Sequence, residues 1–286
     1  MASSAYRGRL APTPTGYLHV GHARTFALAA KRAQQAQGTL LLRIEDLDAT
    51  RCRPEFTQAA LDDLKWLGMT WQEGPDCGGP QAPYIQSQRL ALFTQAWQAL
   101  HATGCLYPCD KSRNDVARAL TAPHAEDDAE PIFPIELRPD LSDGKEARTP
   151  QGTNWRFRVP EGERIAFTDA LSGPHRFTAG EDFGDFLVWR RDGYPAYELA
   201  VVADDHAMGI TEVVRGADLL LSTARQLLIY RALQWTAPQW AHAPLVTDSE
   251  GKRLAKRAGH LSIQSLRQKG WAPEDILSAP LPKLLI

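Results

Sequence analysis

The sequence contains few cysteines, no large excess of either charge and no long apolar run. Four cysteines in 286 residues are too few for a disulfide framework, so reduced thiols are expected. No apolar stretch reaches the roughly 18–20 residues that a membrane span requires. The N-terminus also lacks the apolar core of a secretory signal. These absences predict a cytoplasmic protein without a membrane segment.

The net charge of −2 excludes a protein coated with basic surface, so any nucleic acid would bind a local patch. Apolar and charged contents of 43% and 23% are typical of a globular protein with one large or two modest domains. Basic residues gather near the C-terminus, at Lys252, Arg253, Lys256, Arg257, Arg267 and Lys269. Phosphate contacts there would be salt-sensitive, whereas the alternative is an ordinary solvated face.

The most informative segment, PTPTGYLHVGH, ends at His22 and lies between an apolar run at residues 9–11 and a helical pattern at residues 23–37. A strand that leads into a helix through such a turn presents free backbone N–H groups and the positive end of the helix dipole. Anions, above all phosphates, bind at such points. His19 and His22 would face the same side and direct imidazole donors at the anion. The alternative is a pair of surface histidines that cap a helix.

The surrounding pattern predicts a βαβ unit. Residues 6–11 and 39–44 have the apolar character of buried parallel strands, and the helix at residues 23–37 joins them. Such a unit has a right-handed crossover and a ligand crevice at the C-terminal ends of its strands. Two further helices are predicted, one opened by Pro54 and one capped by Ser87.

The character of the sequence divides the chain into three parts. Residues 1–105 and 181–247 have regular α/β character and predict one α/β domain. Residues 106–180 are richer in prolines and loop residues, with alternating segments that indicate strands, and predict an inserted α+β subdomain. Residues 248–286 are too few for another domain and predict a short helical extension.

Three sequence blocks resemble one enzyme class. The spacing His-x-Gly-His at residues 19–22 resembles the HIGH signature of class I aminoacyl-tRNA synthetases and their nucleotidyltransferase relatives. The run RLAPTPTG at residues 9–16 is similar to the glutamate branch, whereas the glutamine branch typically carries Pro-Glu-Pro-Asn-Gly. The block RIEDLD at residues 43–48 matches the same family. The resemblance covers roughly residues 5–260 and implies an α/β class I synthetase-type Rossmann fold with an inserted subdomain.

The resemblance also implies a glutamate pocket. Arg9 would hold a substrate carboxylate through a bidentate fork, Glu45 would take the α-ammonium group, and Thr13 would lie beside them. Tyr197 matches a substrate-pocket tyrosine, and Arg215 matches a second arginine that would hold the side-chain carboxylate. A core aromatic is the alternative for Tyr197 and a structural ion pair for Arg215. Two arginines suit a dicarboxylic amino acid, because a neutral side chain would leave a buried guanidinium unpaired.

The ATP site implied by the resemblance combines two signatures. Its residues would be His19, Gly21, His22, Arg253 and Lys256. The catalytic charges would come from the two histidines and Lys256. In the second, KMSKS-like segment at residues 252–257, Ala255 replaces the family's serine, whereas the lysine at 256 is kept. ATP would be a substrate, and Mg²⁺ would neutralise the leaving pyrophosphate.

No zinc or other protein-bound metal is expected. Short proteins of this kind often carry Cys-x-Cys followed later by Tyr and Cys, but here Lys111 occupies the second cysteine position. Phe133 and Leu137 stand where Tyr and Cys would follow. Cys105 and Cys109 form a Cys-x₃-Cys pair, but no further well-spaced ligand completes a tetrahedral site.

The absence of an expected anticodon-binding domain, together with the run RGADLLLSTARQ at residues 215–226, resembles the glutamyl-queuosine tRNA(Asp) synthetase family. That resemblance implies activation of L-glutamate as glutamyl-adenylate and its transfer to the queuosine base in the anticodon of tRNA(Asp). The protein would be a monomer that binds the anticodon arm. One alternative is a free-standing glutamyl-tRNA synthetase catalytic fragment that charges a tRNA 3′ end. Others are a small-molecule nucleotidyltransferase and a non-catalytic tRNA-binding protein.

Overall fold

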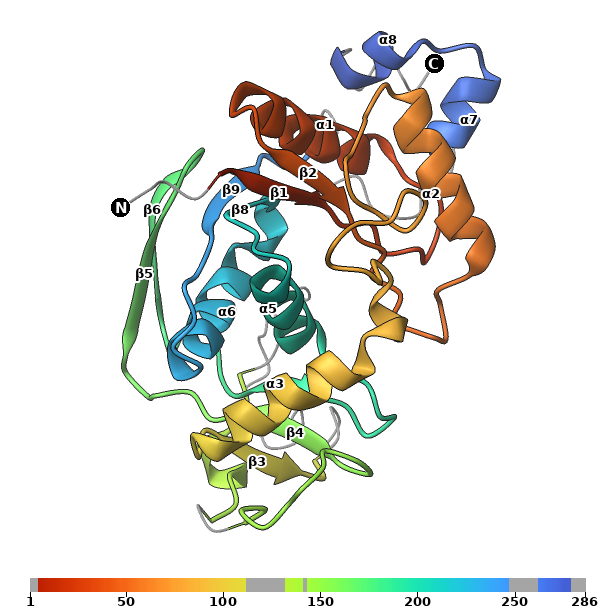
Figure 1. The fold of residues 1–286 in the computed structure, drawn as a ribbon. Helices are drawn as coiled ribbons and strands as arrows, with labels where there is room; N and C mark the ends of the chain where they lie inside the picture. Colours follow the sequence, from red (N-terminus) through yellow and green to blue (C-terminus); the bar gives the residue numbers. More distant parts are fainter. Residues whose placement is uncertain (1–4, 112–131, 141–142, 247–261, 279–286) are drawn as a thin grey trace.

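Helices alternate with parallel strands, an antiparallel sheet and a hairpin in the computed structural model, which describes residues 5–111, 132–140, 143–246 and 262–278 (Figure 1). The helices are α1 (Val20–Gln35), α2 (Pro54–Trp66), α3 (Leu90–Ala102), α5 (Tyr197–Ala207), α6 (Leu220–Ala232), α7 (Ile263–Gln268) and α8 (Pro273–Ser278). The strands are β1 (Arg7–Leu10), β2 (Thr39–Leu42), β3 (Leu106–Cys109), β4 (Asn154–Phe157), β5 (Arg164–Asp169), β6 (Gly173–Thr178), β7 (Phe186–Trp189), β8 (Glu212–Gly216) and β9 (Gln239–Ala243). None of these helices is long and apolar enough to cross a membrane.

The predicted βαβ unit is confirmed. β1 and β2 are parallel, with Leu10 opposite Leu42, and α1 connects them. Three consecutive residues are buried in each strand, 8–10 in β1 and 40–42 in β2, as expected for a parallel sheet covered on both faces. α1 begins at Val20, earlier than the predicted start at residue 23, because the side chain of His19 caps the helix.

A second parallel pair lies beside the first. β8 and β9 are parallel, with Arg215 opposite His242. The backbone N–H of Thr211 donates to the carbonyl of Arg7 over 2.9 Å, and the side chain of Arg9 reaches the carbonyl of Val214. Both segments therefore advance in the same direction, which brings the C-terminal ends of β1, β2 and β8 to one edge.

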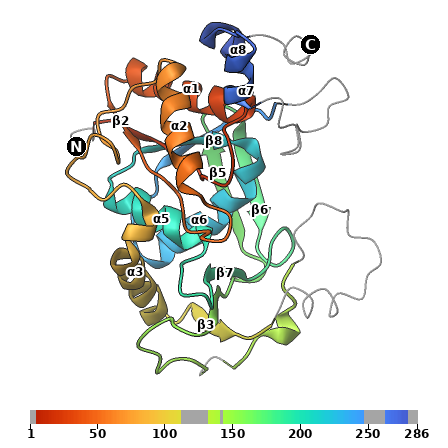
Figure 2. The same ribbon diagram turned by 90° about the vertical axis from the view of Figure 1, so that its right-hand side faces the viewer.

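The inserted region contains an antiparallel sheet and a separate hairpin. β4 pairs with β3 on one side and with β7 on the other, so this sheet continues beyond residue 180, the predicted end of the insertion. The hairpin of β5 and β6 is long and lies along β9, as Figures 1 and 2 show. The N–H of Ala170, at the hairpin turn, donates to the carbonyl of Trp240 over 2.8 Å. Residues of the insertion thus touch the parallel strands directly.

The prediction that Ser87 caps the third helix is wrong. Ser87 lies in a 3₁₀ turn, Gln86–Gln88, and α3 begins at Leu90 without a side-chain cap. The N–H and hydroxyl of Ser87 donate to the carboxylate of Asp46 over 2.8 and 2.6 Å. Ser87 therefore ties the segment after β2 to the chain before α3, a contact over 41 positions that local spacing does not reveal.

The last described residues form the predicted helical extension. The N–H of Ile263 donates to the carbonyl of Leu18 over 2.8 Å, and Ser262 forms a bridge with His19. Arg24 of α1 donates to the carbonyl of Ile276 in α8. α7 and α8 thus pack beside α1 and α2 (Figures 1 and 2).

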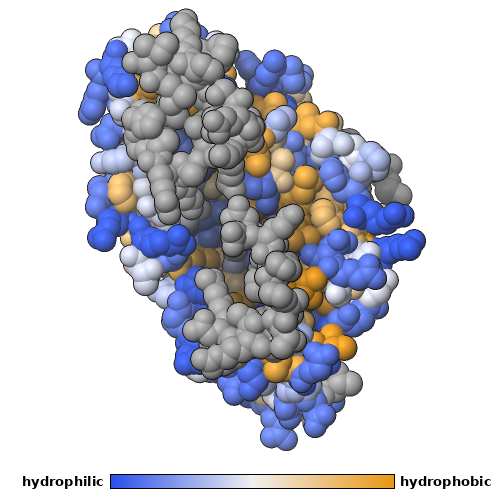
Figure 3. All heavy atoms as spheres, turned by 180° about the vertical axis from the view of Figure 1, so that it is seen from behind, coloured by the Kyte–Doolittle hydropathy of each residue, from blue (hydrophilic) through white to orange (hydrophobic). Residues whose placement is uncertain are grey.

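The face of the molecule that points away from the viewer in Figure 1 is hollowed near its middle, with hydrophobic residues along one side of the hollow (Figure 3).

The buried carboxylate of Asp185 connects strand β3 with the segments that contain Arg138 and Val159. Asp185 is 3% exposed and accepts a hydrogen bond from the Tyr107 hydroxyl, two from the guanidinium of Arg138, and one from the Val159 N–H. These donor–acceptor distances lie between 2.5 and 2.8 Å. Burial and the charge of Asp185 raise the pKa of Tyr107 well above its usual range. Four bonds to one buried group make it a focus of local stability.

Replacing Asp185 should therefore destabilise the fold. We expect Asp185→Asn to lower the free energy of unfolding by about 3 kcal/mol, because it leaves the Arg138 guanidinium without its buried counter-charge. Urea unfolding followed by tryptophan fluorescence measures the change. The matched control is Asp192→Asn, since Asp192 forms an exposed pair with Arg190 that contributes about 0–1 kcal/mol. Equal losses in the two variants would contradict the assignment.

Candidate functional site

The two histidines that begin α1 lie stacked on each other. Their ring centroids are 3.7 Å apart with an interplanar angle of 25°, as their predicted spacing requires. Nδ1 of His19 accepts from the Gly21 N–H over 3.1 Å, and Nδ1 of His22 accepts from the His19 N–H over 3.4 Å. Because each Nδ1 is an acceptor, a neutral ring carries its proton on Nε2. The turn therefore presents two imidazole N–H groups at the positive end of a helix.

The ring of His19 approaches Gly21 closely. A Cβ atom at this position would lie 3.0 Å from Cε1 and 3.1 Å from Nδ1 of His19. A larger residue would therefore require the imidazole to shift by a few tenths of an ångström. The close contact with His19, and not an unusual backbone conformation, therefore explains why glycine suits this position of the His-x-Gly-His motif.

The predicted second ATP signature, including Arg253 and Lys256, lies outside the described residues. The described residues on either side of it both approach the α1 turn. Ser262 bridges to His19, and a Cβ atom at Gly21 would lie 3.9 Å from Val246. Val246 and Ser262, which flank this segment, therefore both lie near the stacked histidines.

On the other side of the site, Arg43 is completely buried among three carboxylates. Its Nη1 donates to Asp205 over 2.7 Å and its Nη2 donates to Glu45 over 3.0 Å. Its Nε lies 3.6 Å from Asp204, which also accepts from Arg89 over 2.6 Å. Burial opposes the charge of Arg43, but the three carboxylates outweigh it and raise its pKa. This network joins the end of β2 to α5.

Arg9, at the end of β1, is also buried but has few partners. It is 4% exposed, and its Nη1 donates to the carbonyl of Val214 over 3.1 Å. Its Nε lies 3.5 Å from Asp205 and has no hydrogen-bond acceptor within the described ranges. A buried guanidinium with unused N–H groups is costly, so an external anion would complete it.

Glu45 lies next to this guanidinium, as predicted. It is 7% exposed, and burial raises its pKa although Arg43 and Arg9 act in the opposite direction. Its backbone N–H donates to the carbonyl of Pro12 over 3.0 Å. Thr13, which follows Pro12 in the sequence, is exposed. Cationic and anionic side chains thus alternate at the ends of β1 and β2.

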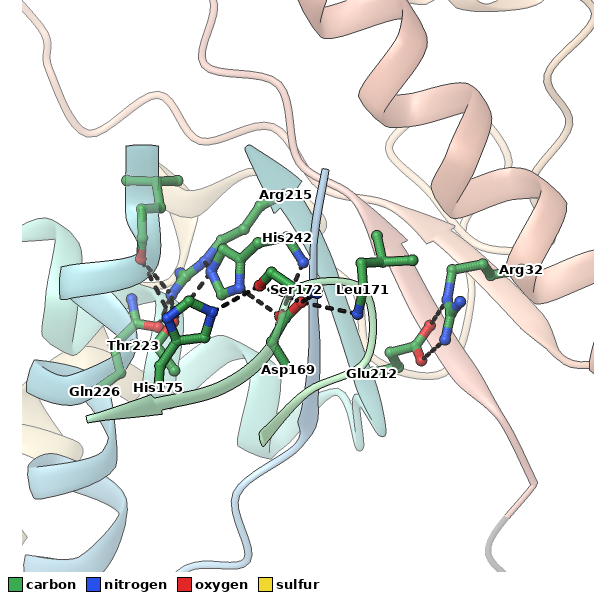
Figure 4. A network of polar contacts seen from close by, with 11 residues as sticks. Arg32, Asp169, Leu171, Ser172, His175, Glu212, Arg215, Thr223, Gln226 and His242 are labelled. Atoms are coloured by element: carbon green, nitrogen blue, oxygen red, sulfur yellow. Dashed lines mark hydrogen bonds and ion pairs between the residues drawn. The ribbon is translucent and has the colours of Figure 1, made fainter. Parts of the chain in front are cut away.

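Arg215, at the end of β8, is held by neutral groups (Figure 4). It is 5% exposed, and its five N–H groups face four acceptors. These acceptors are His242 Nε2 at 3.2 Å, Gln226 Oε1 at 2.9 Å, Thr223 Oγ1 at 2.7 Å and the Leu219 carbonyl at 3.2 Å. No carboxylate among the residues that the structure describes lies within ion-pair distance of it. The structural ion pair considered from the sequence is therefore not what holds Arg215.

The carboxylates closest to Arg215 act on it through one intervening side chain. Asp169 binds Nδ1 of His242 over 2.7 Å, and Glu198 accepts from Nε2 of Gln226 over 2.9 Å. The guanidinium is thereby fixed in orientation while its positive charge is not neutralised by direct contact. A buried cation in this state favours a ligand that carries a negative charge.

Tyr197 lies at the start of α5, next to Glu198. Its side chain is 38% exposed, so it is not a core aromatic. Burial of its hydroxyl raises the pKa of Tyr197 to about 12, although Arg215 acts in the opposite direction. The phenol therefore remains a neutral donor at physiological pH.

Several residues of this site were not identified from the sequence. They are Arg43, Asp204, Asp205, Thr223, Gln226 and His242. The spacing of Thr223 and Gln226, three apart on α6, is a signal that could have placed both on one helix face. The position of His242 opposite Arg215 depends on strand register, for which the sequence offers no comparable signal.

The cysteines of the inserted region lie in different surroundings. Cys109 is 4% exposed and packs with Tyr107 and Phe133, whereas Cys105 is half-buried. The described part of the chain contains no group of three or more His, Cys, Asp or Glu side chains able to hold a metal ion.

Removing the buried cation should destabilise the site and the fold. We expect Arg43→Met to lower the free energy of unfolding by about 3–5 kcal/mol, because it leaves buried carboxylates without their partner. Urea denaturation measures this loss. Arg51→Met is the control, since Arg51 pairs with Asp48 at an exposed turn and should contribute about 0–1 kcal/mol. A loss below 1 kcal/mol for Arg43→Met would refute the role of the network.

The sequence of this chain is similar to those of one family of known proteins. The sequence profile described as "tRNA synthetases class I (E and Q), catalytic domain" matches residues 5–281. The chain is 47% identical over 272 residues to a glutamyl-Q tRNA(Asp) synthetase of Symbiobacterium thermophilum, which is 94% of this chain and 84% of that protein. It is 40% identical over 279 residues to glutamate–tRNA ligase 2 of Nitrosococcus oceani, which is 96% of this chain and 58% of the ligase.

A solved structure supports the same relationship. The glutamate tRNA ligase of Elizabethkingia meningosepticum, determined in complex with its amino acid, superposes with a TM-score of 0.77 at 32% identity. The match covers 90% of this chain and 53% of the ligase, so the chain spans about half the length of that protein.

Proposed function

Since the chain belongs to the class I tRNA synthetases (E and Q), we propose that it activates L-glutamate with ATP and transfers it to the queuosine base in the anticodon of tRNA(Asp). The high identity to a glutamyl-Q tRNA(Asp) synthetase across 84% of that protein supports this substrate. Identity to a glutamate–tRNA ligase is lower, at 40%, and fits the alternative, a fragment that charges a tRNA 3′ end, less well. The expected partner surface is the anticodon arm, and the expected state is a monomer.

The hydrogen-bond partners of two buried arginines, Arg9 and Arg215, support the proposed specificity for glutamate. Arg215 has only neutral direct acceptors among the described residues, and Nε of Arg9 lies 3.5 Å from Asp205 without a hydrogen-bond acceptor there. The α-carboxylate of glutamate would complete Arg9, and its side-chain carboxylate would complete Arg215. Glu45 would take the α-ammonium group. Glutamine would leave Arg215 without a counter-charge, which disfavours it.

The first chemical step needs no general base, because the α-carboxylate of glutamate is already ionised at neutral pH. A carboxylate oxygen attacks the α-phosphorus of ATP, a new P–O bond forms, and the bond to pyrophosphate breaks. His19 and His22 would donate to the phosphate oxygens as negative charge shifts, and Lys256 would add a positive charge. The phosphates of ATP would bring Mg²⁺, which neutralises charge and binds mainly phosphate and water in such sites.

In the second step a hydroxyl of the queuosine ring attacks the activated carbonyl. An ester bond forms, AMP leaves with the electron pair of the broken mixed anhydride, and the proton of the hydroxyl passes to the leaving phosphate or to water. The activated carbonyl and the acceptor hydroxyl must be held close together to react, so positioning supplies most of the acceleration. The strand ends that hold glutamate and the turn that holds phosphate meet there.

Transfer of labelled glutamate to tRNA with and without queuosine tests the proposed function. We expect label only on queuosine-containing tRNA(Asp), in the presence of ATP and Mg²⁺. Equal labelling of both tRNAs, together with charging of an acceptor-stem minihelix, would replace the proposal by a 3′-charging enzyme. Absence of label on every tRNA would refute both.

The role of the stacked histidines has its own test. We expect His22→Ala to lower the rate of glutamate activation by about 10²–10³-fold, because one charge-stabilising donor is lost. The same is expected for Lys256→Ala. Pyrophosphate exchange in the presence of tRNA measures the rate, and circular dichroism checks that the fold is kept. His206→Ala is the control, since His206 stacks on Trp235 at the far end of α5. Normal exchange by His22→Ala would contradict the assignment.

A further inference from the structure

His242 forms a bridge between the hairpin and the pocket arginine (Figure 4). It lies on β9 directly opposite Arg215 of β8 and is 1% exposed. Its Nδ1 is 2.7 Å from Oδ2 of Asp169, which ends β5. Its Nε2 is 3.2 Å from Nε of Arg215 and 3.1 Å from Oγ1 of Thr223. Both ring nitrogens therefore have a partner.

These partners fix one tautomer of the ring. Asp169 is an acceptor and already receives hydrogen bonds from the N–H groups of Leu171, Ser172 and His242, so it remains ionised. Burial acts against this charge, but the hydrogen bonds outweigh it and lower the pKa of Asp169 to about 2. Nδ1 of His242 must then carry the proton. A guanidinium has no acceptor, so the lone pair of Nε2 must receive the Arg215 N–H.

The same geometry requires a neutral ring. A second proton on Nε2 would set an N–H group against the N–H of Arg215 and place two cations about one hydrogen-bond length apart. The groups that face His242 come from three elements. They are Asp169 and His175 on the hairpin, Arg215 on β8, and Thr223 and Gln226 on α6, with Glu198 behind Gln226. Burial and the nearby Arg215 lower the pKa of His242, which agrees with the neutral form.

We propose that His242 is a positioning residue that orients Arg215 toward an acidic side chain, and that Asp169 selects the tautomer that makes this possible. The hairpin of the inserted region thereby sets the specificity of an amino-acid pocket formed by other strands. The inference rests on the proposed function, because it takes glutamate as the ligand of Arg215. Its chemistry requires only an anionic group at that position.

Two matched substitutions separate the acceptor role of His242 from its volume. In His242→Gln the side-chain oxygen can take the place of Nε2 and still accept from Arg215. In His242→Asn the shorter amide reaches only the position of Nδ1. We expect His242→Asn to raise KM for glutamate by about 10–100-fold with kcat changed only a few-fold, since a hydrogen bond to a charged group is lost. Preference for glutamate over glutamine should fall by a similar factor, whereas His242→Gln should stay within a few-fold of the unsubstituted protein.

The pH dependence of KM supplies the second readout. As the pH falls below the ordinary histidine pKa of about 6.5, protonation of His242 removes the acceptor, so KM for glutamate should rise. Because the pKa of His242 is lowered, this rise should be displaced to more acidic pH. It should be absent in His242→Gln and retained in His175→Gln, which removes the imidazole that contacts Ser172. An unchanged pH profile in His242→Gln, or an unchanged KM in His242→Asn, would overturn the proposal.

Nitrogen NMR of the full-length protein distinguishes failure of this inference from failure of the proposed function. At pH 7 the His242 ring should show a protonated Nδ1 and an unprotonated Nε2. A protein that transfers no glutamate yet shows this tautomer would refute the proposed function and leave the geometry of Arg215 supported. A ring protonated on Nε2 would overturn the role assigned to His242, whatever the activity.

Discussion

The site depends on the burial of positive charge where the parallel strands end. Arg43 is completely buried and shares Glu45, Asp204 and Asp205, so the end of β2 is locked against α5. Desolvation makes such an arrangement costly unless every charge has a partner. Because Arg43 holds Asp205 at 2.7 Å, that carboxylate lies 3.5 Å from Nε of Arg9 and does not form a hydrogen bond with it. Arg43 thus has two carboxylate hydrogen bonds, whereas Arg9 has an ion pair with Asp205 at 3.5 Å and a hydrogen bond to the Val214 carbonyl, and so keeps more capacity for a ligand.

Arg215 also lacks a direct hydrogen bond to a carboxylate, but for a different reason. Its direct acceptors are neutral, and the carboxylates of Asp169 and Glu198 act through His242 and Gln226. The intervening side chains orient the guanidinium without cancelling its charge. Under the proposed function, two oriented arginines without a direct hydrogen bond to a carboxylate would discriminate by charge, which is a stronger criterion than shape between glutamate and the nearly isosteric glutamine.

The turn that carries the stacked histidines and the strand that carries Arg9 belong to one continuous segment. The loop from β1 to α1 is held to the chain after β2, since the N–H groups of Glu45 and Arg53 donate to the carbonyls of Pro12 and Pro14. These bonds set the distance between Arg9 and the stacked histidines. A reaction that joins a carboxylate to a phosphate needs that distance fixed, because positioning accounts for much of the rate.

The sequence by itself determined the βαβ unit, the position of the His-x-Gly-His turn at the start of α1 and the family, because strand and helix periods and short motifs are local. It also identified Arg9, Glu45, Tyr197 and Arg215 as candidates for one pocket. Only the tertiary structure decided what surrounds them. The approach of Asp204 and Asp205 to Arg43, the contact of Ser87 with Asp46, and the hairpin's link to Arg215 all join distant segments. Strand register and helix packing create these contacts, and both depend on interactions throughout the fold that no local pattern contains.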